Sequence, residues 1–211
     1  MSRVLTEAIK ENLPVLLVGA PGVGKSDLVG QAAQAAGADL VISHPALQDP
    51  TDFGGIPWPD PATGQANFLP IAQVKSLLSA AKPTVWFLDD LGQAAPAVQA
   101  SCMQWLLARE VHGMRLPPCV TILAATNKRG PGMGVSGFLE PVKSRFSTII
   151  EVVPDLDDWC RWAMTHDVHP DIVAFLRYRP NLLVTEDPPS AEIVNRPSPR
   201  TWAFLSRWHA A

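Results

Sequence analysis

The sequence is poor in cysteine, with three in 211 residues, at Cys102, Cys119 and Cys160. The three are scattered and lack the close spacing that a cysteine-bound metal requires. Such a set indicates free thiols, mostly buried, in a reducing compartment. We therefore expect a cytoplasmic protein without a cysteine metal centre.

An excess of charge and long apolar runs are also missing. The formal net charge of −3 gives no general attraction to nucleic acid or to an anionic membrane surface. No apolar run approaches the roughly 20 residues of a membrane span, and the first residues do not form a signal peptide. The sequence therefore predicts no membrane insertion, and its charge argues against nucleic acid as a partner.

Hydrophobic residues and prolines, in contrast, are plentiful. Hydrophobic residues make up 47% of the chain, enough for one sizeable core and a small second domain. The 21 prolines cluster near residues 45–70, 117–118 and 180–199, which indicates long structured loops between regular elements.

Residues 19–26, GAPGVGKS, fit the phosphate-loop pattern G-x-x-x-x-G-K-[ST]. An apolar, β-branched stretch precedes them at residues 14–18, and a helical pattern follows at 26–36, which is the context that the motif needs. Glycines let backbone N–H groups point inward as an anion nest, and the helix N-terminus adds positive potential. The alternative is a glycine-rich turn without a ligand.

The loop pattern also assigns roles to single residues. Lys25 is expected to reach the β- and γ-phosphates of a nucleotide, and the Ser26 hydroxyl to ligate Mg²⁺. The residues expected to bind the nucleotide are Gly19, Pro21, Gly22, Val23, Gly24, Lys25, Ser26 and Asp27.

Further apolar runs follow the first one, with helical patterns between them at 72–81 and 97–109. The runs lie at residues 40–43, 84–88, 120–124 and 148–153. Runs without polar alternation are typical of strands buried on both faces of a parallel sheet. The alternation of strand and helix predicts an α/β fold over residues 1–153, with a five-stranded parallel sheet in three layers.

After residue 153 the pattern becomes helical. Three helices are predicted at 156–164, 170–178 and 199–209, with a polar, proline-rich loop at 181–196. Four tryptophans have helix-compatible spacing, which favours core packing over a ligand site: Trp159, Trp162, Trp202 and Trp208. We expect residues 154–211 to form a small helical domain.

Two aspartates end the third predicted strand. The run 85–88 leads directly into Asp89 and Asp90, an arrangement that resembles a Walker B motif. Asp89 is expected to hold Mg²⁺ beside Ser26 on a neighbouring strand. The alternative is a solvated helix N-cap. Asp90 is the candidate base that orients and polarises an attacking water.

An amide ends the fourth strand, where the run 120–125 leads into Thr126 and Asn127. At a strand tip next to the aspartates, Asn127 is placed to hydrogen-bond the attacking water or the γ-phosphate as a neutral donor. Taken alone, the residue is equally consistent with an ordinary turn asparagine.

The order of these motifs resembles the AAA+ ATPases over nearly the whole chain, from about residue 5 to 208. More narrowly it is similar to the MoxR-type branch, in the subgroup that pairs with proteins carrying von Willebrand factor A-type domains. The segment 139–146, followed by a strand, belongs to the first resemblance, and the segments that carry the second are 47–57, 155–159, 169–170, 173–177 and 196–202.

The resemblance implies roles for residues that spacing alone leaves open. Asn127 corresponds to the first sensor, and Arg145 to the arginine finger that reaches the nucleotide of the next subunit. Arg145 also fits a surface arginine that caps a helix. Arg200, at the start of a helix in the small domain, corresponds to the second sensor. Asp90 replaces the usual glutamate, and its shorter side chain predicts slow hydrolysis.

The resemblance further implies Mg·ATP as the ligand, a homo-oligomeric ring (a hexamer), and a partner or substrate protein that the ring remodels or activates. Two insertions, at about 54–70 and 110–118, match loops that face the central pore or the partner. The glycine-rich stretch 130–137 lacks a lysine and is expected to be a loop. Two other functions stay open: an ATP-gated scaffold with little turnover, and a nucleic-acid-dependent motor.

Overall fold

A five-stranded parallel sheet forms the centre of the computed structural model, which describes residues 2–128, 138–185 and 195–210. Its strands are β1 (Val15–Gly19), β2 (Asp39–Ser43), β5 (Thr84–Leu88), β8 (Val120–Asn127) and β9 (Thr148–Glu151), in the spatial order β2-β5-β8-β1-β9. The fold class expected from the apolar runs is confirmed. The stretch 130–137 and most of the predicted loop 181–196 lie outside the described residues.

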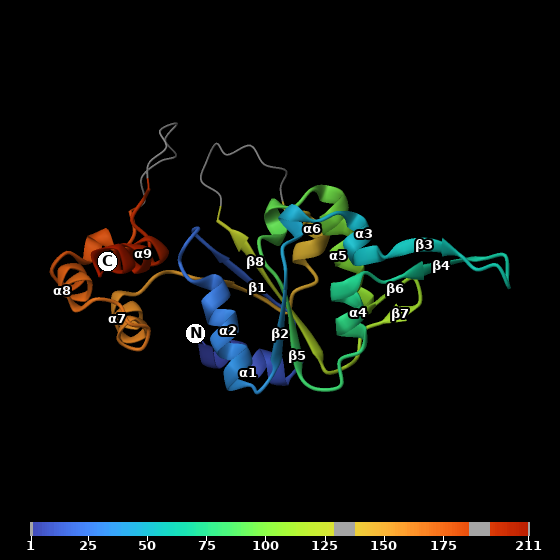
Figure 1. Cartoon of the computed structure of the whole chain (residues 1–211), viewed down its shortest axis with the longest axis horizontal. Coiled ribbons are helices and arrows are strands. Elements are labelled where there is room, and N and C mark those ends of the chain that lie inside the picture. Colours follow the sequence, from blue (N-terminus) through green and yellow to red (C-terminus); the bar gives the residue numbers. More distant parts are fainter. Residues whose placement is uncertain (1, 129–137, 186–194, 211) are drawn as a thin grey trace. The chain divides into compact units, whose positions relative to one another are not determined.

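The buried strands explain the parallel sheet. All five residues of β5 are buried, as are the first seven of β8, so both faces of these strands must be covered. Helix α2 (Lys25–Ala35) lies on one face, while α4 (Ala72–Leu78) and α5 (Pro96–Ala108) lie on the other (Figure 1). These three layers are the predicted ones.

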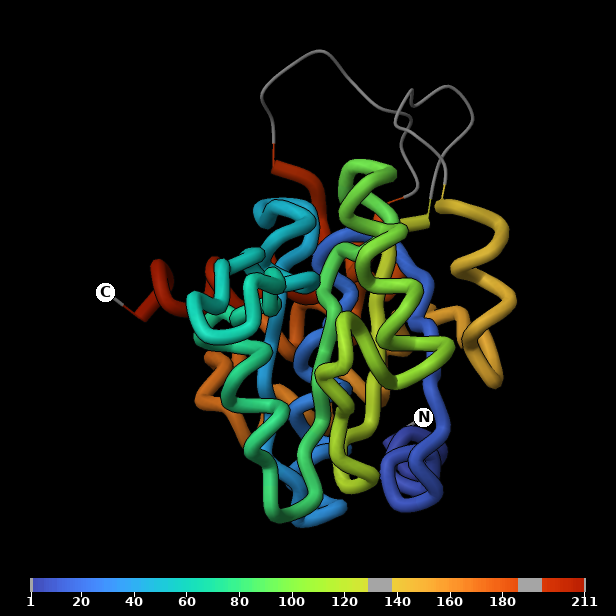
Figure 2. The backbone as a smooth tube through the Cα atoms, turned by 90° about the vertical axis from the view of Figure 1, so that its right-hand side faces the viewer, coloured from blue at the N-terminus to red at the C-terminus, as the bar shows by residue number. Residues whose placement is uncertain are grey.

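Helix α1 (Ser2–Lys10) lies near the edge of the sheet where the strands begin (Figures 1 and 2). The Thr121 hydroxyl, at the start of β8, donates a hydrogen bond to the Ile9 carbonyl at 3.0 Å. Helix α1 therefore packs at the end of the sheet opposite to the one where the predicted polar residues follow the strands.

Trp86 is the centre of the core between the sheet and α5. Its ring is fully buried and lies 5.8 Å from the Trp105 ring in an edge-on arrangement and 6.2 Å from the Phe53 ring in a stacked one. The indole Nε1 donates a hydrogen bond to Ser43 Oγ on the neighbouring strand β2 at 2.9 Å. The residue therefore joins two strands and two helices while its one polar atom stays satisfied.

Both predicted insertions are antiparallel hairpins. The first consists of β3 (Ile56–Pro59) and β4 (Ala66–Leu69) and projects from the sheet domain (Figure 1); the second consists of β6 (Glu110–Val111) and β7 (Met114–Arg115). The Phe68 and His112 rings stack at 3.7 Å with an interplanar angle of 7°. This stacking holds the two hairpins together.

Short helical segments complete this part of the chain. They are η1 (Pro45–Leu47), α3 (Pro50–Gly54), η2 (Leu91–Gln93) and α6 (Glu140–Lys143).

The described residues form two compact units. The sheet unit comprises residues 2–18, 26–127 and 138–150, and the helical unit comprises 19–25, 128, 151–185 and 195–210. Residues 19–25 of the phosphate loop therefore group with the C-terminal helices and not with the sheet. The predicted boundary after residue 153 stays a prediction.

The helical unit has the predicted helices at their predicted bounds: α7 (Leu156–Met164), α8 (Pro170–Tyr178) and α9 (Pro199–His209), with a short η3 (Pro180–Leu182). Trp159 is buried in its core, and Trp162 and Trp202 pack against that core. The expectation for Trp208 is wrong, since its side chain is 79% exposed near the end of α9. Helical spacing places a residue on a helix but does not show which neighbour covers it.

The three cysteines are free, with Cys102 and Cys160 buried and Cys119 partly buried. Burial raises the pKa of the Cys102 thiol far above its usual value, so this thiol stays protonated and unreactive. Over the described residues, no helix is both long and apolar enough to cross a membrane.

We expect Trp86→Ala to lower the free energy of unfolding by about 3–5 kcal/mol, because it opens a large cavity and leaves Ser43 Oγ without its donor. Trp58→Ala is the matched control, since this tryptophan is 60% exposed on the first hairpin and its loss should cost under about 0.5 kcal/mol. Urea unfolding of both variants measures the difference. Equal losses would contradict the assignment of Trp86 to the core.

Candidate functional site

Three of the predicted polar residues lie where strands end. Asp89 and Asp90 follow β5 directly, and Asn127 is the last residue of β8. Because parallel strands end at the same edge of a sheet, these side chains meet there. Ser26, in the first turn of α2, joins them by donating a hydrogen bond from Oγ to Asp89 Oδ2 at 2.7 Å.

One detail of the prediction is wrong. Ser26 and Asp89 were expected on neighbouring strands, but β8 lies between β1 and β5 in the sheet. The two side chains meet because Ser26 lies beyond the end of β1, on the helix that follows the loop, and reaches Asp89 past the tip of β8. The intervening strand brings Asn127 into the same group.

The Asp89 carboxylate is held in one orientation. Its Oδ2 accepts from Ser26, its Oδ1 accepts from the Asp90 backbone N–H at 3.1 Å, and its own backbone N–H donates to the Ser43 carbonyl at 2.9 Å. The paired hydroxyl and carboxylate oxygens are the ligand types that Mg²⁺ prefers. The site thus fits the predicted ion through these two residues.

The Asp90 carboxylate contacts Asn127. Asn127 Nδ2 donates a hydrogen bond to Asp90 Oδ1 at 3.0 Å, so the predicted base and the predicted sensor are in direct contact. Asp90 also has a left-handed backbone, with φ 57° and ψ 33°. Aspartate tolerates this conformation better than longer side chains do, because its short polar side chain can bond locally.

Gln93 also belongs to this group, and the sequence analysis missed it. In the orientation that satisfies both ends of its amide, Nε2 donates to the Asp90 carbonyl at 3.1 Å and Oε1 accepts from the Asn127 backbone N–H at 3.0 Å. Gln93 therefore ties the residue after β5 to the tip of β8. No motif marks it; only its position, at the end of the short helix η2 that Asp90 precedes, could have suggested a role.

Gly92 allows this close approach. A Cβ atom at residue 92 would lie 2.1 Å from Thr126 Oγ1 and 2.7 Å from a ring atom of Phe138. Only glycine fits between η2 and the end of β8, so the residue is required by packing next to the aspartates.

Residues 19–25 of the phosphate loop belong to the helical unit. Gly22 and Gly24 have positive φ values of 77° and 93°, as a loop that turns its amides inward needs. Lys25 is buried, at 6% exposure, and its Nζ donates to the carbonyls of Gly19 and Ala20 at 3.1 and 3.0 Å. Its ammonium group is thereby held against the loop itself.

Other predicted loop residues differ in exposure. Val23 is buried, Pro21 is exposed, and Asp27 is exposed in the first turn of α2. Gly19 lies close to the chain after β9, since a Cβ there would be 2.7 Å from the Val152 carbonyl oxygen.

Arg200 lies beside the loop in the same unit. Its backbone N–H donates to the Gly22 carbonyl at 3.1 Å, and a Cβ at residue 22 would come within 2.8 Å of Ser198 Oγ. Ser198 and Thr201 form a capping box that begins α9 at this point. A pocket of about 860 Å³ is lined by Pro21 and Gly22 of the loop and by residues of α9 and the segment before it.

Arg145 follows α6 and stands apart from these contacts. Its backbone N–H donates to the Val142 carbonyl at 3.1 Å. Its side chain is partly exposed, yet Nε is buried and, within the described part of the chain, has no hydrogen-bond partner. The roles of arginine finger and of helix cap both stay predictions for Arg145.

A comparison with known families decides the affiliation. The family model described as "AAA domain (dynein-related subfamily)" matches residues 14–146, which is more than half of the chain. The chain belongs to this AAA domain family. The match covers the loop, both aspartates, Asn127 and Arg145.

Relatives and solved structures agree with an AAA domain. The "ATPase family gene 2 protein homolog B" of Rattus norvegicus is 32% identical over an alignment of 124 residues, and the match covers 54% of this chain but only 15% of the rat protein. The chain thus spans a small part of such relatives. Among solved structures, a RuvB mutant of Thermotoga maritima superposes with a TM-score of 0.62 at 18% identity, covering 98% of this chain and 58% of that one.

A second solved structure, NtrX from Brucella abortus, superposes with a TM-score of 0.56 at 15% identity. The superposition covers 98% of this chain and 49% of the NtrX chain. At these identities the likeness shows the fold alone. It establishes the three-layer P-loop NTPase architecture with C-terminal helices for the AAA domain described here.

The same substitution should have opposite effects at two glycines of the sheet unit. Gly92→Ala is expected to lower the free energy of unfolding by about 1–3 kcal/mol, because the methyl group overlaps Thr126. Gly30→Ala should raise it by about 0.5–1 kcal/mol, because residue 30 lies inside α2 and its added Cβ meets nothing closer than 4.0 Å. Chemical denaturation measures both; destabilisation by Gly30→Ala would contradict this packing.

Proposed function

We propose that the AAA domain binds and hydrolyses Mg·ATP. The observation that carries this proposal is the hydrogen bond between Ser26 Oγ and Asp89 Oδ2 at 2.7 Å, since it joins the end of the phosphate-loop motif to the acid after β5. Lys25 directly precedes Ser26 and adds the cation that phosphates need. Membership of the AAA domain family supports ATP as the nucleotide.

Ser26 and Asp89 are the residues that would hold Mg²⁺. When bound, the ion neutralises charge on the phosphate oxygens. The loop amides and Lys25 bind the phosphates, and the pocket beside Pro21, Gly22 and α9 supports a place for the rest of the nucleotide.

Asp90 is proposed as the general base and Asn127 as the residue that fixes its position. The Asp90 carboxylate accepts this hydrogen bond at Oδ1 and keeps its second oxygen for a water molecule. Gln93 positions both residues through their backbones. The shorter reach of aspartate compared with glutamate supports a slow rate of hydrolysis.

Arg145 and Arg200 are proposed to complete the site. The buried, unpartnered Nε of Arg145 supports a guanidinium that finds its acceptor elsewhere, on the nucleotide of a neighbouring subunit. Arg200 begins the helix that contacts Gly22 and is proposed as the second sensor. Arg200 is proposed to contact the nucleotide of its own subunit, whereas the role of Arg145 requires a neighbouring subunit, for which we propose a ring, a hexamer.

The output of the ring is proposed to be the remodelling or activation of a partner protein, as in the MoxR-type branch, with a von Willebrand factor A-type domain as the candidate partner. The exposed Trp58 on the first hairpin, and the stacking of Phe68 on His112, support a surface that contacts such a protein. The net charge of −3 supports a protein partner rather than nucleic acid.

We expect Asp90→Asn to lower kcat for ATP hydrolysis by about 100- to 10,000-fold while ATP affinity stays near the wild-type value, because asparagine keeps the shape but accepts no proton. Steady-state phosphate release measures the rate, and fluorescence of a labelled ATP analogue measures binding. Asp157→Asn, an exposed acid in the first turn of α7, is the matched control and should change neither value. Turnover that survives Asp90→Asn would contradict the base assignment.

Mixing two inactive variants tests whether Arg145 acts on a neighbouring subunit. Arg145→Ala and Asp90→Asn should each be inactive alone, whereas an equal mixture should recover about a quarter of the wild-type sites, because one subunit supplies Asp90 and the next supplies Arg145. The measurement is the ATPase rate against mixing ratio at constant total protein.

Two outcomes would contradict this arrangement. A mixture no more active than its components would show that Arg145 does not act between subunits. A protein that stays monomeric with ATP, with ADP and without nucleotide, as measured by mass photometry, would have no interface for such a site.

A further inference from the structure

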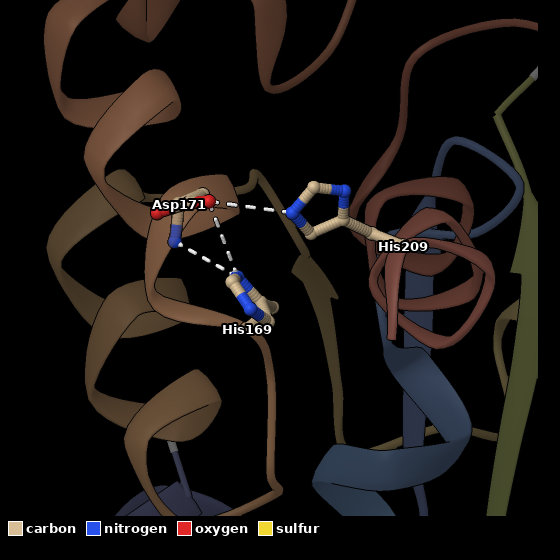
Figure 3. A group of neighbouring side chains, drawn as sticks. All are labelled: His169, Asp171 and His209. Atoms are coloured by element: carbon tan, nitrogen blue, oxygen red, sulfur yellow. Dashed lines mark hydrogen bonds and ion pairs between the residues drawn. The ribbon is translucent and has the colours of Figure 1, made fainter. Parts of the chain in front are cut away.

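Three side chains with metal-binding groups converge in the helical unit, in residues to which the ATPase site assigns no role. They are His169, just before α8, Asp171, in the first turn of α8, and His209, the last residue of α9 (Figure 3). The two histidine side chains point toward the same carboxylate, His169 from the segment just before α8 and His209 from the end of α9.

The distances suit a single ion. His209 Nε2 lies 3.3 Å and His169 Nδ1 lies 3.7 Å from Asp171 Oδ2, and one ligand atom from each residue falls within 4.8 Å of the others. Ligand atoms about 2.0–2.1 Å from a tetrahedral ion are about 3.3 Å apart. Two of the three atoms already have this separation, and rotation of exposed side chains can supply the rest.

The backbone that carries these residues is held in place. The His169 N–H donates to Ser206 Oγ at 2.7 Å, and Ser206, one turn before His209, is buried. The two imidazole rings meet edge to face with centroids 4.5 Å apart. The Trp202 indole also donates to the Leu182 carbonyl at 2.8 Å, which fixes α9 against the segment after α8. The backbone that carries the ligands is therefore preorganised, and binding needs rotation of side chains but no rearrangement of the helices.

We propose that His169, Asp171 and His209 bind a transition-metal dication of the zinc class. Two imidazoles and one carboxylate select such ions over Mg²⁺ and Ca²⁺, which prefer oxygen ligands alone. Asp171 and His209 are exposed, so the fourth position is open to water. The proposal does not depend on the ATPase function, because these residues are separate from those assigned to Mg·ATP.

The hydrogen bonds and helix ends around the three ligands predict a moderate affinity for the metal ion. His169 Nδ1 accepts a hydrogen bond from the Asp171 backbone N–H at 3.3 Å and so caps α8, and an ion at this nitrogen replaces that bond. The N-terminus of α8 opposes a cation, whereas the Asp171 carboxylate and the C-terminal end of α9 favour it. The bound ion joins the start of α8 to the end of α9, and Arg200 lies in the first turn of α9.

A calorimetric titration with ZnCl₂ tests the proposal. The wild-type protein is first stripped of metal with EDTA, and the titration is done in excess Mg²⁺ and without nucleotide. We expect one saturable site per chain. His209→Ala and Asp171→Asn should each weaken it at least tenfold, since even indirect partners of metal ligands cost about ten- to 100-fold. His169→Asn, which keeps a capping acceptor for α8, should do the same.

Two control variants locate the ion. His166→Ala removes an exposed histidine of the same unit that stacks on Trp162 and should leave the affinity unchanged. Asp89→Asn should also leave it unchanged, because it affects only the proposed Mg²⁺ site. Absence of a saturable site in the wild type, unchanged affinity in His209→Ala and Asp171→Asn, or loss of binding in Asp89→Asn would each overturn the proposal.

Discussion

The position of β8 between β1 and β5 is the constraint on which the site depends. It separates the loop strand from the strand that ends in the aspartates, so no single pair of adjacent strands contains the site. The tip of β8 instead contributes Asn127 directly between the two, where it contacts Asp90. Because Gly92 leaves no free space against Thr126, this strand end cannot move without disturbing the aspartates.

Much of the fold could be predicted because its signals are local. Strand β5 has the predicted bounds, since an uninterrupted apolar run admits few other structures. Helices α8 and α9 of the C-terminal unit begin at prolines that follow capping residues, as at Ser198 and Pro199, and such starts are visible in sequence. The order of the strands was not visible, because it is set by pairings between segments far apart in the chain.

The contacts that sequence reasoning missed are also long-range. Gln93 acts through the backbone of Asn127, 34 positions later, and nothing near Gln93 in the sequence marks that contact. His209 and Asp171 are 38 positions apart, and each alone resembles an ordinary helix-end residue. Patterns identify residues that share a motif, whereas these groups exist only because helices and strands pack in one particular way.

The left-handed backbone at residue 90 gives a physical reason for aspartate at a position where the resemblance to the AAA+ ATPases leads one to expect glutamate. A left-handed residue of this type costs about 1–2 kcal/mol, and asparagine or aspartate reduces that cost by bonding locally. Glutamate has a longer side chain, which bonds less readily to the local backbone and would therefore relieve less of this strain. The shorter side chain therefore matches the turn that Gly92 and Gln93 impose. The slow rate that we propose would then follow from how tightly the strand tips are packed rather than from a damaged motif.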